Sequence, residues 1–114
     1  MSSQEQQRQP RLLLHNGVIV TLEQGPFWIA GRAVKKGKPV DVDLTPHGAY
    51  ESGVSRTHIR ISRSGDQFTV EDLNSWNETT LNGDRLIPGQ PYALRSGDVL
   101  YLGRFRCLFS ITLE

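Results

Sequence analysis

Residues 105–113 carry the longest alternating pattern in the chain, and this pattern constrains the fold more than any other feature. Apolar residues occupy every second position, so they face one side of a strand while mostly polar residues face the other. Shorter segments of the same kind come before it and are separated by glycine, proline, asparagine or aspartate. No segment shows sustained helical periodicity. The sequence therefore predicts an all-β fold, a β-sandwich or barrel of many short strands.

The strands that we expect before residue 105 are short and rich in β-branched or aromatic residues. They span residues 12–14, 18–22, 27–29, 59–62, 67–71, 80–81, 85–87, 92–94 and 99–102, and a further short strand fits residues 40–44.

The length of 114 residues predicts one domain, large enough for a core without disulfides. Basic and acidic residues number 13 and 12, so bulk charge gives no basis for binding nucleic acid or a membrane surface. The single cysteine, Cys107, excludes an internal disulfide and is expected to be an inert core thiol. No apolar run is long enough to span a bilayer, and the start lacks the apolar stretch of a signal peptide. We therefore expect a cytoplasmic protein.

Residues 1–10 are polar and glutamine-rich without periodicity, which predicts a disordered N-terminal tail. The domain is then expected to occupy residues 11–114. Its longest irregular part spans residues 33–54, and long loops in compact domains are often functional. The final Leu113-Glu114 resembles a remnant of an expression vector, so we expect a module of a larger polypeptide.

The three histidines, His15, His47 and His58, are far apart and lack the spacing of metal ligands. The lysine-rich segment fails the spacing of a nucleotide-binding phosphate loop, because Pro39 follows Lys38 where serine or threonine is required. We therefore expect neither a metal site nor a cofactor.

Ser55 and Arg56 lie in a turn-like stretch that runs directly into the strand expected at residues 59–62. A hydroxyl, backbone N–H groups and a guanidinium on such a loop suit an anion such as phosphate. A solvated loop before an edge strand is the alternative that these residues leave open. A hydrolase built on Ser55 and His58 ranks last, because the sequence has no nucleophile-elbow pattern. His58 is better interpreted as a structural group that ties loops together.

Short polar motifs follow one another along most of the chain, namely Gly31-Arg32, Ser55-Arg56-Thr57-His58, the loop 74–79, Asn82-Gly83, Ser96-Gly97-Asp98 and Leu102-Gly103. Each motif is weak alone, but their order and spacing resemble the forkhead-associated (FHA) domain over residues 12–112. The resemblance implies a β-sandwich of about eleven strands that binds phosphothreonine peptides through loops at one end, without catalysis.

The resemblance also assigns roles to single residues. Arg32 matches the arginine that pairs with the phosphate, and Ser55 matches the serine whose hydroxyl also bonds it. Arg56 sits where the family has a further phosphate contact, and Asn77 matches the asparagine that bonds the peptide backbone. The implied partner is a phosphothreonine-containing protein, a substrate of a Ser/Thr kinase.

Three further matches and two departures concern the shape of the binding loops. Gly31 and His58 match a structural pair of the family, and Thr79 is expected to be structural as well. Trp76 stands where the family often has a phosphate-binding threonine, so we expect Trp76 to pack on the peptide instead. Glu78 stands where glycine is usual, and other residues disfavour a positive φ. Its charge would weaken phosphate binding or select a basic peptide residue, so we expect an altered loop and moderate affinity.

A second interpretation is an FHA-like scaffold domain that makes phosphorylation-independent protein–protein contacts. Residues 33–54 or an exposed sheet face would supply the surface. The two interpretations separate on whether binding requires the phosphate and Arg32.

Overall fold

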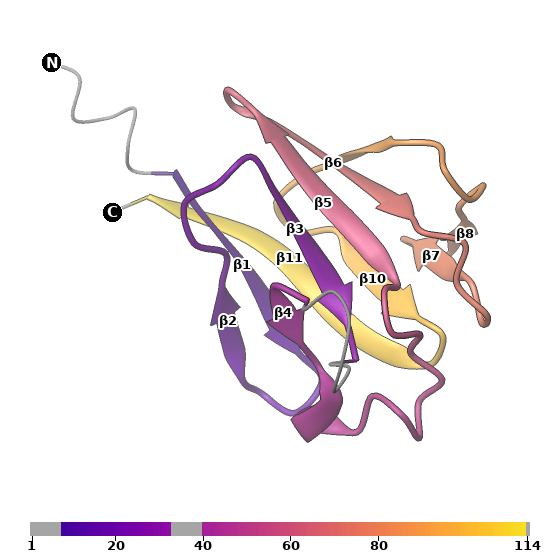
Figure 1. Cartoon of the computed structure of the whole chain (residues 1–114). Coiled ribbons are helices and arrows are strands. Elements are labelled where there is room, and N and C mark those ends of the chain that lie inside the picture. Colours follow the sequence, from indigo (N-terminus) through magenta and orange to yellow (C-terminus); the bar gives the residue numbers. More distant parts are fainter. Residues whose placement is uncertain (1–7, 33–39, 114) are drawn as a thin grey trace, which may run out of the picture.

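Two β-sheets pack face to face in the computed structural model, which describes residues 8–32 and 40–113 (Figure 1). The six-stranded sheet has the order β2 (Ile19–Thr21), β1 (Arg8–Leu14), β11 (Phe105–Leu113), β10 (Val99–Leu102), β7 (Thr79–Leu81) and β8 (Asp84–Arg85). The five-stranded sheet has the order β4 (Val42–Asp43), β3 (Phe27–Gly31), β5 (Ile59–Ser64), β6 (Gln67–Asp72) and β9 (Tyr92–Leu94). The predicted all-β sandwich of about eleven strands is confirmed.

All strand pairs are antiparallel except β3 with β4, which run parallel. A short 3-10 helix, η2 (Thr45–His47), follows β4. Within the two described ranges, no helix has the length and apolar character needed to cross a membrane.

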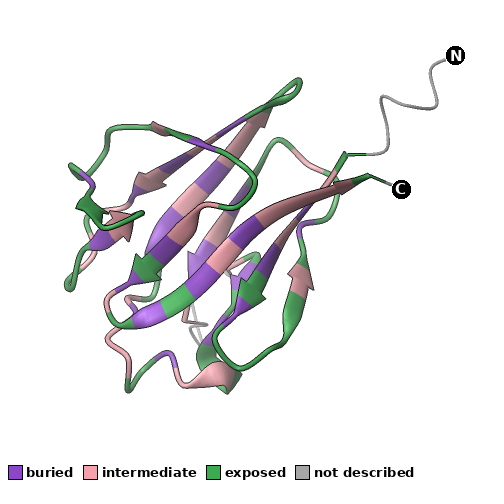
Figure 2. Cartoon of the chain, turned by 180° about the vertical axis from the view of Figure 1, so that it is seen from behind, coloured by how far each residue is buried: buried purple, intermediate pink, exposed green. Residues whose placement is uncertain are grey.

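The core lies between the sheets and follows from the alternation along the strands, which is visible on β11 in Figure 2. Leu12 of β1 pairs with Phe109 of β11, and Leu100 of β10 pairs with Cys107, all four being buried. Burial raises the pKa of the Cys107 thiol to about 12, so the thiol stays protonated and poorly nucleophilic at neutral pH. The expected core position of Cys107 is therefore confirmed.

The longest pairing joins β1 to β11 and runs from Arg8 opposite Leu113 to Leu14 opposite Cys107. Residues 8–10, which the sequence predicted as part of the tail, therefore belong to a strand. Their polar composition hid this, because the stabilising partner lies about a hundred residues away in the chain. The rest of the predicted tail, residues 1–7, and the lysine-rich part of the long irregular segment, residues 33–39, lie outside the described residues.

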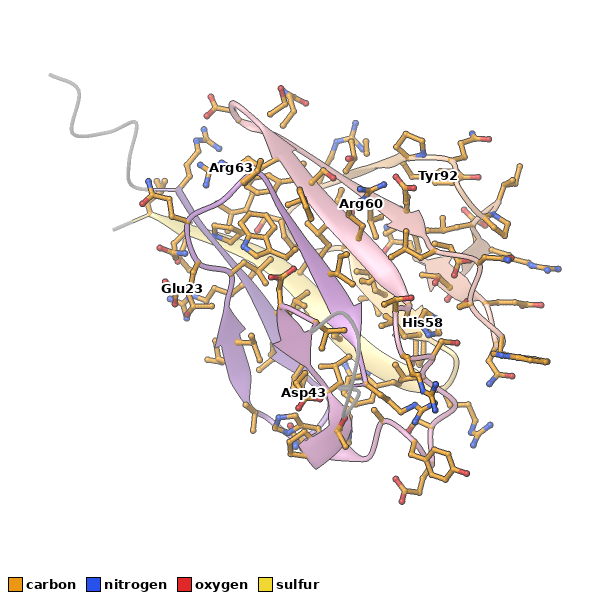
Figure 3. The ribbon with its side chains drawn as sticks, viewed as in Figure 1. Glu23, Asp43, His58, Arg60, Arg63 and Tyr92 are labelled. Carbon is orange, nitrogen blue, oxygen red and sulfur yellow. The ribbon has the colours of Figure 1, made fainter. Side chains whose placement is uncertain are left out.

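The two ends of the sandwich differ in what they carry. His58 lies just before β5 at one end, and Arg63 lies near the opposite end of the same strand (Figure 3). The backbone N–H of Leu73, just after β6, donates to the carbonyl of His58 over 2.9 Å, so the loops that precede β5 and follow β6 meet at the same end. Most candidate functional residues of the sequence lie in these loops, and Arg32, just after β3, contacts the first of them through Ser55.

Candidate functional site

Gly31, the last residue of β3, is where the first loop contact forms. The backbone N–H of the next residue, Arg32, donates to the carbonyl of Ser55 over 3.1 Å. A Cβ atom built on Gly31 would stand 2.1 Å from the carbonyl oxygen of Arg56. Any side chain at this position would therefore push the Ser55–Arg56 loop away from the end of β3.

His58 is buried and holds two loops together. Its Nδ1 atom accepts the backbone N–H of Ser55 over 3.0 Å, and its Nε2 atom lies 3.0 Å from the carbonyl oxygen of Glu78. A backbone N–H can only donate and a carbonyl can only accept, so these partners require the neutral tautomer that is protonated at Nε2. Burial lowers the pKa of His58, although the Glu78 carbonyl and the charge of Asp72 act in the opposite direction.

The Ser55 hydroxyl has a different partner from the imidazole. Its Oγ atom accepts the backbone N–H of Trp76 over 3.0 Å, whereas His58 contacts the backbone of Ser55. A hydroxyl that accepts in this way keeps its own hydrogen available for donation. The arrangement suits a donor to an anion and differs from the hydroxyl–imidazole hydrogen bond of a serine hydrolase.

A network centred on Asp72 shapes the loop between β6 and β7. One carboxylate oxygen of buried Asp72 accepts the hydroxyls of Ser75 and Thr79, over 2.5 and 2.6 Å. The other accepts the backbone N–H of Ser75 over 3.0 Å. Burial alone would raise the pKa of Asp72, but the hydrogen bonds from Ser75 and Thr79 hold it below its ordinary value. Sequence reasoning missed Asp72 and Ser75, although an aspartate three residues before a serine is a common loop-closing pattern.

The guanidinium group of Arg32 is held in place by a hydrogen bond from its Nε atom and by an aromatic ring. The Nε atom donates to the carbonyl of Val54 over 2.6 Å, and the guanidinium carbon lies 5.1 Å from the ring centroid of Tyr50. Among the described residues, the two terminal nitrogens of Arg32 have no hydrogen-bond partner. The guanidinium is thus oriented while its terminal fork can still donate.

Asn77 and Trp76 complete this end of the sandwich. Asn77 donates from Nδ2 to the carbonyl of Gly53 over 3.0 Å, which leaves its side-chain oxygen and its second N–H for other partners. Trp76 is 91 % exposed, so its indole contributes little to the fold.

Two open hollows adjoin each other here. The first, of about 420 Å³, is lined by Arg32, Tyr50, Gly53, Val54, Ser55, Trp76 and Asn77. The second, of about 410 Å³, is lined by Arg32, Ser55, Arg56, Thr57, Leu73, Asn74 and Trp76. The structure thus brings together the five residues predicted to contact the ligand: Arg32, Ser55, Arg56, Trp76 and Asn77.

Charge distinguishes these hollows from one near the opposite end. Neither hollow at the loop end is lined by an acidic side chain. A hollow beside the β2–β3 turn is lined by Glu23 and Asp41 and by no basic side chain, so it does not suit an anion. Within the described ranges, no group of three or more histidine, cysteine or acidic residues is placed to hold a metal ion.

Glu78 has a positive φ of +68°, a left-handed backbone conformation that the sequence analysis predicted to be unfavourable for this residue. Its carbonyl accepts both the His58 imidazole over 3.0 Å and the backbone N–H of Gly103 over 2.9 Å. These bonds offset the steric cost of a left-handed residue that has a Cβ atom. The carboxylate lies 3.3 Å from Arg85 Nη2 in an exposed ion pair, so its charge is partly compensated.

Comparison with known proteins places this architecture in a family. The family model of the FHA domain matches residues 28–103. The oxoglutarate dehydrogenase inhibitor of Corynebacterium jeikeium is 39% identical over 102 residues, which cover 85% of this chain and 67% of the relative. FraH of Nostoc sp. is 41% identical over 66 residues, covering 58% of this chain and 22% of FraH. FhaA of Mycobacterium tuberculosis is 43% identical over 53 residues, covering 46% of this chain and 10% of FhaA. The chain therefore spans only a minor part of FraH and FhaA.

Solved structures agree with the sequence comparison. An FHA domain from work on phosphothreonine-dependent FHA domain interactions is 31% identical, with a TM-score of 0.70 over 90% of this chain and 95% of that one. The FhaA FHA domain, solved in complex with the intracellular domain of Rv3910, is 30% identical, with a TM-score of 0.69 over 88% of this chain and 98% of that one. This chain belongs to the FHA domain family.

Proposed function

We propose that the loop end of the sandwich binds a phosphothreonine-containing segment of a partner protein, without catalysis. The observation that carries the proposal is the joint placement of Arg32 and Ser55. Both line the same two hollows, and each keeps hydrogen-bond donors available after its internal bonds are made.

The donors answer the chemistry of a phosphothreonine. Its phosphate carries close to two negative charges and three acceptor oxygens. The terminal fork of Arg32 provides a bidentate, charged donor, and the Ser55 hydroxyl provides a neutral one. Arg56, which lines the second hollow, adds positive charge beside them. We therefore place the phosphate between Arg32, Ser55 and Arg56.

The peptide next to the phosphothreonine would pass over Asn77. Its side-chain oxygen and remaining N–H can bond one backbone N–H and one carbonyl of an extended segment. Trp76, whose backbone N–H already orients Ser55, would pack its exposed indole on the same segment.

The relatives support this proposal for the family. One similar structure comes from work on phosphothreonine-dependent FHA interactions, and another shows an FHA domain with the intracellular domain of a second protein. We propose that the partner of this chain is likewise another protein, marked on threonine by a Ser/Thr kinase.

The test is a titration of one peptide sequence in three forms: phosphothreonine, phosphoserine and unphosphorylated threonine. We expect binding of the phosphothreonine form alone, and loss of that binding in Arg32→Ala. Equal binding of all three forms by the folded protein would exclude phosphate recognition.

A second candidate function, phosphorylation-independent contact, is favoured by the outward face of the six-stranded sheet. Ile19, Leu13, Leu108 and Val99 face each other across β2, β1, β11 and β10, so they form one apolar row on the solvent side. Outward positions of such a sheet are usually polar, and exposed apolar patches mark interaction surfaces.

The two candidate functions can be distinguished by the treatments and substitutions that disrupt a complex with a given partner protein. Phosphate recognition predicts that the complex is lost after phosphatase treatment and in Arg32→Ala. Use of the sheet face predicts that the complex survives both treatments and is lost in Leu108→Ser, because Leu108 lines neither hollow at the loop end.

A further inference from the structure

Strand β2 (Ile19–Thr21) forms one edge of the six-stranded sheet, and none of the described strands lies on its outer side (Figure 1). On its inner side, the carbonyl of Val18 accepts the backbone N–H of Leu14 over 2.8 Å. The backbone N–H of Leu22 likewise donates to the carbonyl of Pro10 over 2.9 Å. Positions 18 and 22 therefore direct their backbone groups toward β1.

The backbone groups of Ile19 and Thr21 point the other way. Successive residues of an antiparallel strand direct their N–H and C=O groups to opposite sides, so position 20 faces β1 together with positions 18 and 22. Ile19 and Thr21 thus present N–H and C=O groups along the free edge, in the spacing that a further strand requires.

The side chains of this segment do not protect the edge. Residues 18–22 contain no charged residue, no proline and no glycine, and all except Leu22 are β-branched, which favours strands. Ile19 is 53 % exposed, and Val18 is exposed as well. An exposed edge that is apolar and uncharged is a template for pairing with another strand.

The other edge strands carry features that hinder such pairing. β4 and β8 have only two residues each, and both include charged residues. β9 follows directly after Pro91, which has no N–H group to donate. Of the described edges, β2 alone has three uncharged residues and no adjoining proline.

We infer that β2 pairs antiparallel with β2 of a second copy of this chain, which joins the two six-stranded sheets into one. A two-fold axis beside Val20 places Ile19 of each copy opposite Thr21 of the other, where both residues donate and accept backbone hydrogen bonds. In this register Glu23 lies opposite Gly17, so no like charges meet. The segment is thus complementary to itself, which favours a second copy over an unrelated strand.

The pairing is weak, because a short edge covers far less surface than the roughly 1,200 Å² or more of a stable interface. It also directs the two loop ends apart. The Nε2 atom of His15 lies 2.8 Å from the carbonyl oxygen of His47, so β2 begins beside η2, which leads into the segment that lines the first hollow. Antiparallel pairing therefore places the two loop ends at opposite ends of the dimer. The inference does not depend on the proposed function.

Sedimentation equilibrium of the whole chain between about 10 μM and about 1 mM measures the self-association. The weight-average mass should rise across this range from that of one chain toward that of two. Thr21→Pro removes an outward N–H without breaking a bond to β1, so this variant should remain a monomer throughout. Thr21→Val keeps the N–H and the β-branched shape, so it should associate like the wild type.

Two further measurements locate the contact. Ile19→Lys places a charge on the edge and should also remain a monomer. Amide hydrogen exchange of the wild type should be slower for Ile19 and Thr21 at about 1 mM than at about 10 μM. The amide of Val20, which faces β1, should change little between the two concentrations.

A monomer at about 1 mM would overturn the inference. A dimer that persists in both Thr21→Pro and Ile19→Lys, or whose protected amides lie elsewhere, would also overturn it, because another surface would then hold the two copies. Thr21 lines neither hollow at the loop end, so Thr21→Pro should still bind a phosphothreonine peptide. Loss of self-association is thereby distinguished from loss of phosphate recognition.

Discussion

The Nδ1 atom of His58 accepts the backbone N–H of Ser55 over 3.0 Å, which fixes the loop that presents the Ser55 hydroxyl. The opposite ring nitrogen meets the carbonyl of Glu78 over 3.0 Å. One buried, neutral imidazole therefore sets the distance between the Ser55 loop and the loop that carries Asn77. Protonation at Nδ1 would direct one N–H group at another and break the first contact.

We predict that the free energy of unfolding falls as the pH drops below about 6.5, the ordinary pKa of histidine. Burial lowers the pKa of folded His58, so in acid the unfolded chain binds a proton that the folded chain does not. The contribution of His58 is fully present above the unfolded pKa and is lost as the pH falls through the folded pKa. The largest slope from this one group is about 1.4 kcal/mol per pH unit.

Urea denaturation at several values between about pH 8 and pH 5 measures this dependence. His58→Gln removes the titrating group, so its slope below the histidine pKa should be smaller than that of the wild type. If the variant does not fold, the ring resonances of His58 in the wild type provide the test. Titration of that ring at its ordinary pKa would contradict the prediction.

Replacing Arg32 should weaken phosphothreonine binding. A hydrogen bond to a charged group is worth about 1.5–3 kcal/mol, so Arg32→Ala should cost at least about tenfold in affinity. Arg32→Lys keeps the charge but loses the planar fork, so its affinity should fall between those of the wild type and the alanine variant. Isothermal titration with one phosphopeptide measures all three.

The matched control for this series is Arg106→Ala. Arg106 is an exposed arginine on the outward face of β11, opposite Tyr101 of β10. It should leave the affinity unchanged. Equal losses in the two alanine variants would mean that net charge, rather than the position of Arg32, sets the affinity.

Gly31→Ala should be destabilising and should impair binding. Its methyl group would stand 2.1 Å from the carbonyl oxygen of Arg56, so the Ser55–Arg56 loop must move. We expect a loss of about 1–3 kcal/mol in the free energy of unfolding, together with weaker phosphopeptide binding. Gly89→Ala is the comparison, because its Cβ would meet no atom within 4 Å. Because Gly89 has a φ of +83°, alanine should lower the free energy of unfolding there, but the variant should bind the phosphopeptide with normal affinity.

Glu78→Gly should give a slightly more stable protein that binds phosphopeptides more tightly. Glu78 has a φ of +68°, and glycine relieves a cost of about 1 kcal/mol there. The variant also loses the exposed ion pair with Arg85, which is worth less, about 0–1 kcal/mol. Thermal unfolding and peptide titration measure the two effects. Arg85→Ala isolates the ion pair, and a destabilised Glu78→Gly with a neutral Arg85→Ala would contradict the account.

Much of the fold could be predicted because its determinants are local in the sequence. The alternation of apolar and polar residues identifies strands such as β6 and β11, and turn residues mark where strands end. Both signals can be recognised without knowing which distant segments pair. Residues 8–10 depended on long-range contacts with β11 instead. The network of Asp72 joins residues only three and seven positions apart, but it depended on the burial of Asp72. In the sequence, a strand whose outward residues are polar cannot be distinguished from a tail until its partner strand is known. The sequence also does not show whether an aspartate in a loop is buried or exposed.

The candidate site could likewise be predicted only in part. The polar motifs indicated which residues to examine, because their types and order are visible in the sequence. The sequence could not show that Tyr50 packs on Arg32, since Tyr50 belongs to no motif and the contact forms only when the loop after η2 folds back. It also could not show how Glu78 accepts a positive φ, because the compensating bonds come from His58 and Gly103.

The central claim is that a phosphothreonine is held between Arg32 and Ser55 at the loop end of the sandwich. Amide chemical-shift mapping of the whole chain during titration with a phosphothreonine peptide tests it most directly. The account predicts the largest shifts for the Ser55 and Trp76 amides and for the side-chain N–H groups of Arg32 and Asn77, with none for the unphosphorylated peptide. Shifts confined to the outward face of the six-stranded sheet, or equal shifts with both peptides, would contradict it.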